Sequence, residues 1–452
     1  PPVFNFLADV KRANIKNLNM LDQNVAFTGK FNVNFTGSNI DNFLGDARIT
    51  DATLTRDGVP LPFDSLIVSS YVENDKKTLQ AHSNEFDARV TGDFSIRELP
   101  DAFKLFLNKY YPAYIKAPKH ILEKESFEFD ITTGYIEDYI RLFDSTFTGF
   151  NNSHITGNLN TTTNTLALNA EVPQFKYLQY NFDDVTLTAN GTADSLGLFG
   201  RATNIRIGDS LNVPLALFRI NAHNDTSQVR IFTGANQGID QARINATVLT
   251  YQNGVRIEFE PSNFVVNGKT WTIDETGELE FRNNVPANGR LLLRESDQEI
   301  TIRTHPSDVG TWNDVTVELK KVNLGDLGPL IMPRNRLEGL ASGTVQIEDP
   351  TGKMRITSDD FIAQSLRLDN DSLGDVKATV LYDGETKQLS IKGNTVNEQN
   401  SLAFDMKLFL ENKESQRNNI ISLKANTFEL KYLERFLGTL FSDISGYITG
   451  NF

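Results

Sequence analysis

Residues 402–408 read Leu-Ala-Phe-Asp-Met-Lys-Leu, so large apolar side chains alternate with small or charged ones. Strict alternation places one side of an extended chain in an apolar environment and the other side in water, as in a half-buried β-strand. The same period of two recurs in many other segments, for example at Phe31–Phe35, Phe127–Ile131 and Val315–Leu319. The sequence therefore predicts a protein built mainly of β-strands.

Turn dipeptides separate these runs. The pairs Asp57-Gly58, Asn190-Gly191, Asn253-Gly254, Asn267-Gly268 and Asp383-Gly384 are typical of tight hairpins, because both positions tolerate positive φ. Hairpins at short spacing favour an antiparallel meander over a parallel β-helix, which needs crossovers or coils of constant length. We expect an elongated, twisted antiparallel sheet.

A short signature occurs twice. Leu337-Glu-Gly-Leu-Ala-Ser-Gly343 aligns with Ile444-Ser-Gly-Tyr-Ile-Thr-Gly450, so that the glycine pair recurs 107 residues later. A self-match at a fixed offset indicates an array of supersecondary units. The expected unit is a helix, a glycine-spaced turn and then a meander of strands. The second copy stops at Phe452, so we expect a piece of a longer repetitive β protein.

Four short amphipathic helices interrupt the strand pattern. They are expected at 100–114, where Pro100 suits a first helical turn, at 136–143, at 430–441 and, more weakly, at 324–330. Each could flank the edge of a sheet or pack on it in the ordinary way.

Charge and composition exclude several classes of function. The net charge of −14 disfavours nucleic acid, which needs a basic surface, and disfavours an anionic membrane surface. There are no cysteines, so disulfides, zinc thiolates and thiol nucleophiles are absent. The N-terminus shows no signal-peptide pattern, and no apolar run is long enough for a membrane-spanning helix.

No motif for catalysis or metal binding stands out, so we expect no enzyme, no cofactor and no metal. The five histidines are not at ligand spacing from one another. Gly268-Lys269-Thr270 lacks the first glycine of a phosphate loop, and 369–375 lacks the closing glutamate of a calcium loop. Asp-Ser-Leu at Asp64, Asp194, Asp209 and Asp371 resembles an O-glycosylation tripeptide of Bacteroidota-type exported proteins, and equally suits a turn before a strand.

The open question is what covers the apolar sides of the strands. Two sheets could pack face to face into a closed core, about 10 Å apart. Alternatively, one sheet could curl into a trough with an apolar interior, which would bind acyl chains. Scarce Trp (2 residues) favours the trough over a filled sandwich. The predicted groove-lining residues are Phe31, Val33, Phe35, Phe127, Phe129, Leu166, Leu168, Val185, Leu187, Ile205, Ile207, Ile244, Val248, Val255, Ile257, Phe259, Val315, Val317, Val376, Val380, Leu402, Phe404 and Met406.

The repeat texture resembles the TamB family of the translocation and assembly module, in its Bacteroidota-type form. The likeness is carried by Leu337–Asp383, by the terminal FLGTLFSDISGYITGNF and by Phe31–Gly58. TamB belongs with the AsmA-like proteins, which have repeating β-grooves. The resemblance covers most of the chain through its texture and supplies no catalytic residue.

The resemblance implies a periplasmic groove protein, anchored in the inner membrane, that conducts phospholipid acyl chains toward the outer membrane. It also implies an outer-membrane barrel partner of the TamA type, bound through regions outside this chain. No anchor helix or partner-binding end is identified in the sequence. The expected segments are groove at 1–98, a helix-containing insertion at the groove rim at 99–145, groove at 146–336, a groove repeat with a terminal helix at 337–443, and the truncated start of the next repeat at 444–452.

Two other functions stay open. A scaffold for outer-membrane protein assembly could take up nascent strands at sheet edges by β-augmentation. A carbohydrate-binding array or adhesin would need exposed aromatic platforms, and two Trp make it the weaker alternative.

Overall fold

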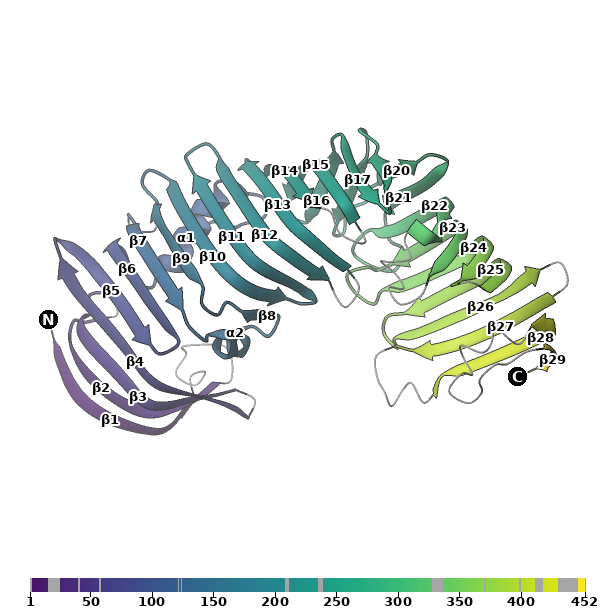
Figure 1. The fold of residues 1–452 in the computed structure, drawn as a ribbon. Coiled ribbons are helices and arrows are strands. Elements are labelled where there is room, and N and C mark those ends of the chain that lie inside the picture. The colour runs from purple at the N-terminus through teal and green to yellow at the C-terminus, as the bar shows by residue number, and fades with distance from the viewer. Residues whose placement is uncertain are drawn as a thin grey trace. The chain divides into compact units, whose positions relative to one another are not determined.

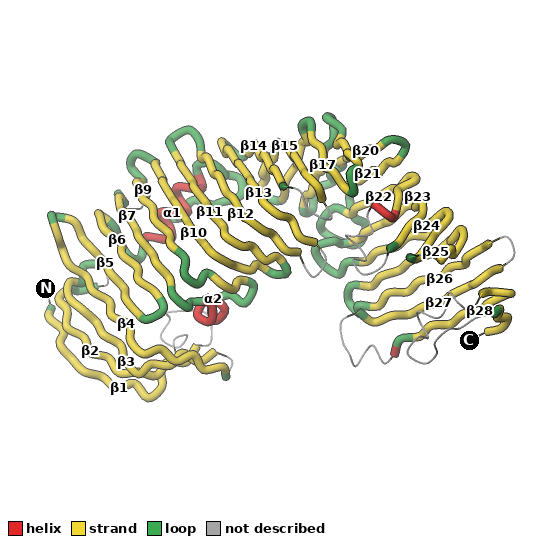
Figure 2. Tube along the Cα trace, viewed as in Figure 1, coloured by secondary structure: helices red, strands yellow, loops and turns green. Residues whose placement is uncertain are grey.

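The computed structural model describes residues 2–14, 25–39, 41–56, 58–120, 122, 124–207, 211–234, 239–326, 336–369, 371–397, 400–410, 418–429 and 446–451. The chain forms two compact units, unit 1 (Pro1–Thr233) and unit 2 (Gly234–Phe452). Within the described residues the fold is all-β and antiparallel, with few and short helices (Figure 2), so the predicted class is confirmed.

Unit 1 contains one antiparallel sheet and two helices (Figure 1). Its elements are β1 (Val3–Asn14), β2 (Val25–Thr36), β3 (Leu44–Arg56), β4 (Val59–Glu73), β5 (Lys76–Ser83), β6 (Phe86–Asp93), α1 (Leu99–Asn108), β7 (Ser126–Thr133), α2 (Glu137–Phe143), β8 (Phe147–Gly149), β9 (His154–Asn160), β10 (Thr165–Tyr177), β11 (Tyr180–Gly191), β12 (Leu196–Ile207), β13 (Leu211–His223) and β14 (Thr226–Thr233). Each strand from β1 to β7 pairs with the next, β7 pairs with β9, and β9 to β14 continue in order. The short β8 pairs with the far end of β10.

Unit 2 is likewise built of antiparallel strands. Its strands are β15 (Ile239–Tyr251), β16 (Gly254–Phe259), β17 (Ser262–Val266), β18 (Lys269–Ile273), β19 (Glu278–Arg282), β20 (Gly289–Glu295), β21 (Gln298–His305), β22 (Asp314–Asn323), β23 (Leu337–Glu348), β24 (Arg355–Leu368), β25 (Asp371–Asp383), β26 (Gln388–Asn397), β27 (Asn400–Phe409), β28 (Ile420–Glu429) and β29 (Tyr447–Asn451). β15 pairs with β16 along one half and with β17 along the other, and the two branches meet again at β20. From β20 to β29 each strand pairs with the next.

The hairpin predictions are confirmed at three of the dipeptides. Asn253-Gly254, Asn267-Gly268 and Asp383-Gly384 lie where one strand ends and the next begins. Asn190-Gly191 was wrongly predicted as a turn, because it ends β11 and the turn follows at 192–195, where the Thr192 N–H donates to the Ser195 carbonyl at 2.9 Å. Asp57 lies outside the described residues.

Bulges interrupt the strands of both units. Asp51 in β3, Lys321 in β22, Ser365 in β24 and Thr427 in β28 all have positive φ, between 50° and 51°. The pairing registers of these strands shift nearby. A bulge bends its strand and increases the local twist. Repeated bulges therefore curl each sheet.

The repeated signature takes part in two of these bulges. Ser342 and Thr449 occupy the same place in the two copies. The Ser342 hydroxyl accepts the N–H of Lys321, and the Thr449 hydroxyl accepts the N–H of Thr427, both at 2.9 Å. The repeat thus preserves a hydroxyl that satisfies the unpaired N–H of the neighbouring bulge.

The expected glycine-spaced turn is wrong for the first copy of the signature, which lies within strand β23. In the second copy, Tyr447–Gly450 lie in β29, Gly446 lies just before that strand, and residues 444–445 are outside the described residues. Gly339 has φ 137°, and a Cβ there would lie 3.0 Å from the Gln364 carbonyl oxygen of β24. Positive φ and close backbone approach both require glycine. The glycines therefore serve strand packing at a bulge and not a chain reversal.

Two of the predicted helices are confirmed, although the first ends at Asn108 and not at 114 as expected. α1 has Pro100 in its first turn and buries Ala102 and Phe106, and its last turn leads to the buried Tyr110. α2 begins where the Asn151 side-chain oxygen accepts the N–H groups of Ile136 and Glu137, at 2.8 and 3.0 Å. Residues 324–326 form a single helical turn, and 327–330 and 430–441 lie outside the described residues.

Candidate functional site

One face of the unit 1 sheet carries apolar side chains on every strand from β1 to β7 and from β9 to β14. Residues paired directly across antiparallel strands share a face. A continuous cross-strand row on this face contains no polar residue, and we call it the apolar row. It consists of Phe6, Val33, Ala47, Val68, Ala81, Ala88, Ile131, Ile155, Ala170, Leu187, Gly200, Phe218 and Ile231.

The apolar row is accessible along much of its length. Phe6 and Ile231, near its two ends, are 46% and 37% exposed, and most of the residues between them are half-buried. All the described strands of unit 1 lie within the hydrogen-bonded sheet itself, so among them none forms a second sheet over this face.

The predicted groove-lining residues of unit 1 share the face of the apolar row. Phe31 and Phe35 flank Val33 on β2, and Phe129 pairs with Gly157, which pairs with Leu168. Of the predicted residues on this face, Val33 and Phe127 are buried, and the others are half-buried: Phe31, Phe35, Phe129, Leu166, Leu168, Val185 and Leu187.

The alternation shifts by one residue in the middle of β10 to β13. Asp184 and Leu215 have φ of 44° and 47°, and the apolar positions move from Val172 on β10 to Phe175 three residues later. A bulge changes the phase of the alternation. Ile205 lies beyond this shift and pairs with Phe182. The side chain of Ile207 lies outside the described part of the chain.

Aromatic rings gather beyond the shift. Phe175 stacks on Phe182 with ring centroids 4.5 Å apart and on Phe150 at 5.1 Å. Phe147 and Tyr177 are 4.7 Å apart. These rings extend the apolar surface toward the ends of the strands near α2, and sequence analysis had identified none of them.

Helix α1 covers the opposite ends of the strands. Ala102, Phe106 and the adjoining Tyr110 form a buried cluster with Phe127, Leu159, Leu196 and Ala222. A Cβ on Gly191 would lie 2.2 Å from Phe106, so the helix packs directly on β11. Phe127 therefore belongs to a core beneath α1. Of the two roles considered for the helical segments, α1 has the second: it packs on the sheet and does not flank its edge.

Polar contacts fix the chain that follows α1. The Tyr110 hydroxyl donates to the Thr192 carbonyl, and the Tyr111 hydroxyl lies 2.8 Å from the Ser227 hydroxyl. The Asp225 carboxylate accepts the Ala113 N–H at 3.0 Å. Burial raises the pKa of Tyr110. The helix is thus anchored to two hairpins of the sheet and is a fixed part of unit 1.

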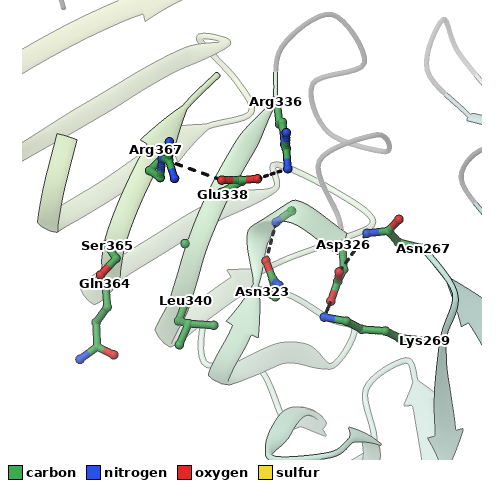
Figure 3. Close-up of a pocket in the computed structure, with 12 residues that line it drawn as sticks. Asn267, Lys269, Asn323, Asp326, Arg336, Glu338, Leu340, Gln364, Ser365 and Arg367 are labelled. Carbon is green, nitrogen blue, oxygen red and sulfur yellow. Dashed lines mark hydrogen bonds and ion pairs between the residues drawn. The ribbon is translucent and has the colours of Figure 1, made fainter. Parts of the chain in front are cut away.

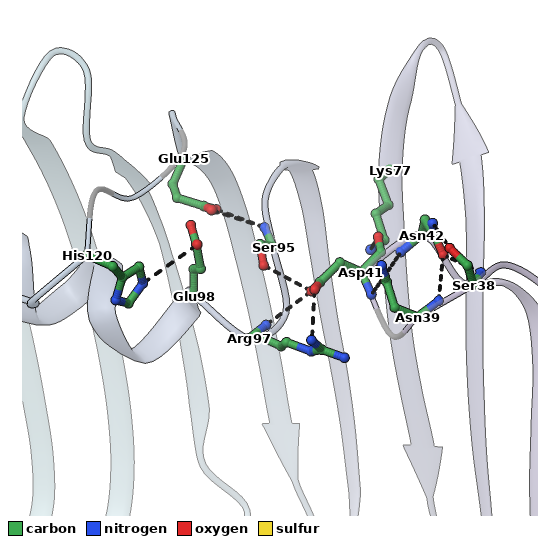
Figure 4. A network of polar contacts seen from close by, with 10 residues as sticks. All are labelled: Ser38, Asn39, Asp41, Asn42, Lys77, Ser95, Arg97, Glu98, His120 and Glu125. Carbon is green, nitrogen blue, oxygen red and sulfur yellow. Dashed lines mark hydrogen bonds and ion pairs between the residues drawn. The ribbon is translucent and has the colours of Figure 1, made fainter.

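A polar cluster holds the other end of α1 (Figure 4). Lys77 pairs with Gly92, so its stem lies on the apolar face, and its Nζ donates to the Asp41 carbonyl at 2.5 Å. The Asp41 carboxylate accepts the Ser95 hydroxyl at 3.0 Å, and both oxygens of the buried Glu125 accept the Ser95 N–H at 3.1 Å. Burial lowers the pKa of Lys77, and the charges of Asp41 and Glu125 oppose this shift.

Unit 2 repeats the two-faced arrangement. One cross-strand row runs through Leu291, Ile302, Val317 and Val345, and another through Val380, Ile391, Met406 and Ile421. The pairing places the predicted residues of unit 2 on the apolar side of their strands, with Val376 and Leu402 buried and the others half-buried: Ile244, Val248, Val255, Ile257, Phe259, Val315, Val317, Val380, Phe404 and Met406.

In unit 2, a cavity of about 500 Å³ lies between the end of β22, the start of β23, the end of β24 and the Asn267–Lys269 turn (Figure 3). The buried carboxylate of Asp326 accepts hydrogen bonds from Lys269 Nζ at 2.7 Å and from Asn267 Nδ2 at 3.2 Å. Glu338 lies 2.6 Å from Arg336 and 4.0 Å from Arg367. These charges already have opposite charges beside them, so the cavity differs in chemistry from the apolar rows.

The described residues show no group of three or more His, Asp or Glu side chains that could hold a metal ion. No helix in the described ranges is long and apolar enough to cross a membrane. The chain matches no protein-family model, no curated protein and no solved structure. Fold and site together define an all-β protein whose antiparallel sheets each have one apolar and one polar face.

Proposed function

We propose that this protein is a non-enzymatic groove protein that conducts phospholipid acyl chains along the apolar faces of its sheets. The observation that carries the proposal is the apolar row of unit 1, which crosses thirteen strands without a polar residue. An exposed apolar surface larger than roughly a few hundred Å² is unusual unless it binds something.

Acyl chains fit such a surface for a physical reason. Each buried CH₂ contributes roughly 0.8 kcal/mol, without any need for side-chain-specific recognition. Every strand of the row presents an apolar residue, for example Ile131, Ile155 and Ala170 on the successive strands β7, β9 and β10. An acyl chain that moves from one strand to the next therefore stays in apolar contact throughout.

The cellular setting of the proposal rests on the sequence resemblance to the TamB family. On that basis we propose that the protein acts in a Gram-negative periplasm, where it supports outer-membrane biogenesis by moving phospholipid between the two membranes. In that setting the parent protein is anchored in the inner membrane, and a TamA-type barrel is contacted through regions outside this chain.

The test is phospholipid bound to the purified protein, measured by mass spectrometry, followed by removal of lipid and rebinding of a fluorescent phospholipid. Leu187→Glu puts a charge in the apolar row and should clearly reduce the rebinding. The matched control Thr188→Glu lies on the opposite face, where Thr188 pairs with Asn169, and should bind like the wild type. A wild-type protein that never takes up phospholipid would contradict the proposal.

A second candidate is a scaffold that receives unfolded outer-membrane strands by β-augmentation. The observation that favours it is β1, a strand of 12 residues that pairs only with β2 within the described chain. Val3 and Leu7 on this strand are 70% and 80% exposed. Photocrosslinkers at these two positions should label an unfolded barrel protein if this candidate is correct, and should label none if the protein handles lipid alone.

A further inference from the structure

The polar face of unit 1 carries a cluster of arginines on β12, β13 and β14. Arg219 on β13 pairs directly with Arg230 on β14. Arg201 on β12 pairs with Leu217, two residues from Arg219, and so lies diagonal to Arg219 on the same face. All three arginine side chains are exposed. Together with Phe199, Leu217 and Phe232 they form what we call the arginine patch.

The three arginines of this patch are unpaired. Within the described residues, none of them forms an ion pair, although the protein carries a net charge of −14. Some basic side chains on the polar face of unit 2, by contrast, lie beside carboxylates. Examples are Arg303 with Glu318, Lys320 with Glu299 at 3.2 Å, and Lys392 with Asp405 at 3.0 Å.

Two like charges directly opposite each other destabilise a sheet. Arg219 and Arg230 therefore carry a repulsion in the unbound protein, which an anion placed between them would turn into attraction. A guanidinium presents its N–H groups as a fork that matches a carboxylate.

Apolar side chains are interleaved with the arginines. Phe199 is 41% exposed, and the Arg219 guanidinium lies over its ring at 5.8 Å. Leu217 and Phe232 face each other across β13 and β14. Arginine together with aromatic residues is the composition of the energetic centre of protein interfaces.

We propose that the arginine patch docks an acidic segment of a partner protein, whose carboxylates pair with Arg201, Arg219 and Arg230 while an apolar side chain packs on Phe199. Charge complementarity identifies the occupant. A short acidic segment fits better than an anionic bilayer, because it contacts the patch alone, whereas an extended anionic surface would also face other parts of a chain with a net charge of −14. The surface is on the opposite face from the apolar row, so its function is independent of lipid conduction.

The experiment measures binding of a fluorescein-labelled peptide of alternating Glu and Phe by fluorescence anisotropy, at low and at physiological salt. The combined substitutions Arg201→Gln, Arg219→Gln and Arg230→Gln should weaken binding at least about tenfold, because each charge-assisted pair contributes on this order. Phe199→Ser should weaken it by a smaller factor.

The matched control removes the same number of positive charges from the polar face of unit 2, through Arg303→Gln, Lys320→Gln and Lys392→Gln. It should leave peptide affinity at physiological salt within about twofold, since these residues are not part of the arginine patch and salt screens exposed charges. A companion peptide with Lys in place of Glu should not bind. Three results would each overturn the proposal: equal binding of both peptides, equal affinity of the triple Arg variant and the wild type, or no binding to the wild type.

Two further readouts keep the outcome unambiguous. Vesicles of phosphatidylglycerol that bind through the three arginines, without peptide binding, would assign the patch to a membrane and overturn the proposal. The midpoint of thermal unfolding of the triple Arg variant should equal or exceed that of the wild type, because repulsion is removed. A clear fall in that midpoint would mean that the arginines are structural and would also overturn it.

Discussion

In unit 1, the strand ends beneath α1 and the parts of the same sheet away from α1 show the same apolar alternation. Their side chains differ in how far they are buried. Under α1, Phe127, Leu159 and Leu196 are at most 8% exposed. Further along these strands and their neighbours, Ile155 and Leu187 are half-buried and belong to none of the buried clusters of the described chain. The difference teaches that alternation fixes which face is apolar, whereas a covering element decides whether that face is core or binding surface.

Unit 2 shows the same contrast with a smaller cover. Leu324, in the helical turn 324–326, packs with Ala341, Ala363 and Val376. One turn covers less of a sheet face than a ten-residue helix such as α1. In both units, a short helical element therefore buries part of the apolar face at the ends of the strands.

The largest change in stability should come from Phe106→Ala, which removes the ring that α1 packs against the sheet. Phe106 is 1% exposed, so the free energy of unfolding should fall by about 3–5 kcal/mol. Urea denaturation followed by circular dichroism measures it. Phe199→Ala, on the exposed polar face, is the control and should change the free energy far less. Equal effects would mean that α1 does not form a core.

A smaller difference in stability is expected between alanine substitutions at a glycine beneath α1 and at a glycine that α1 does not cover. A Cβ at Gly191 would meet Phe106 at 2.2 Å, and one at Gly200 would meet Phe218 at 1.9 Å. Phe106 is enclosed, whereas Phe218 is half-buried and can turn aside. Gly191→Ala should therefore destabilise by about 1–3 kcal/mol and Gly200→Ala by less. The reverse order in thermal unfolding would contradict an open apolar row.

Curvature of the uncovered sheet depends on its bulges, and Ser342→Ala tests one of them. The Lys321 N–H would lose its acceptor, with an expected loss of about 1 kcal/mol in the free energy of unfolding. Ser342→Thr keeps a hydroxyl, as Thr449 does in the second copy of the signature, and should retain most of the stability. An alanine variant as stable as the threonine variant would show that the hydroxyl does not hold the bulge.

The smallest effect concerns Lys77, beside the covered end. Its lowered pKa means that the unfolded chain binds more protons than the folded chain between the folded pKa and the ordinary value of 10.5. Stability should therefore rise with pH across that window. In Lys77→Met this rise should be reduced, and thermal unfolding at neutral and alkaline pH measures it. An unchanged pH dependence in the variant would contradict a half-buried, charged Lys77.

The sequence predicts the fold class and the orientation of the strands for a simple physical reason. Alternation at Leu402–Leu408 or Val315–Leu319 depends on local sequence alone, and each predicted groove residue with a described side chain lies on the apolar side of its strand. The bulges were missed because they depend on contacts between strands, such as Ser342 with Lys321. The same dependence explains why the signature was misread as a turn.

The candidate site was predictable only in part. Large residues such as Leu187 and Val380 stand out in the alternation, whereas Ala47, Ala88 and Gly200 become members of the apolar row through pairing alone. No sequence pattern shows which residues α1 will cover. The arginine patch was missed for a related reason, since its three arginines are 11 to 29 positions apart in the chain and meet only through strand register.

The central claim is that acyl chains contact the apolar face and not the polar one. The chain has no cysteine, so a single one can carry an environment-sensitive nitrobenzoxadiazole label. The label would be placed at Leu187 on the apolar row in one variant and at its neighbour Thr188, which faces the other way, in a second. On adding phosphatidylethanolamine below its self-association concentration, emission should shift to the blue and brighten at 187 and stay constant at 188. No change at 187, or equal changes at both positions, would contradict the account.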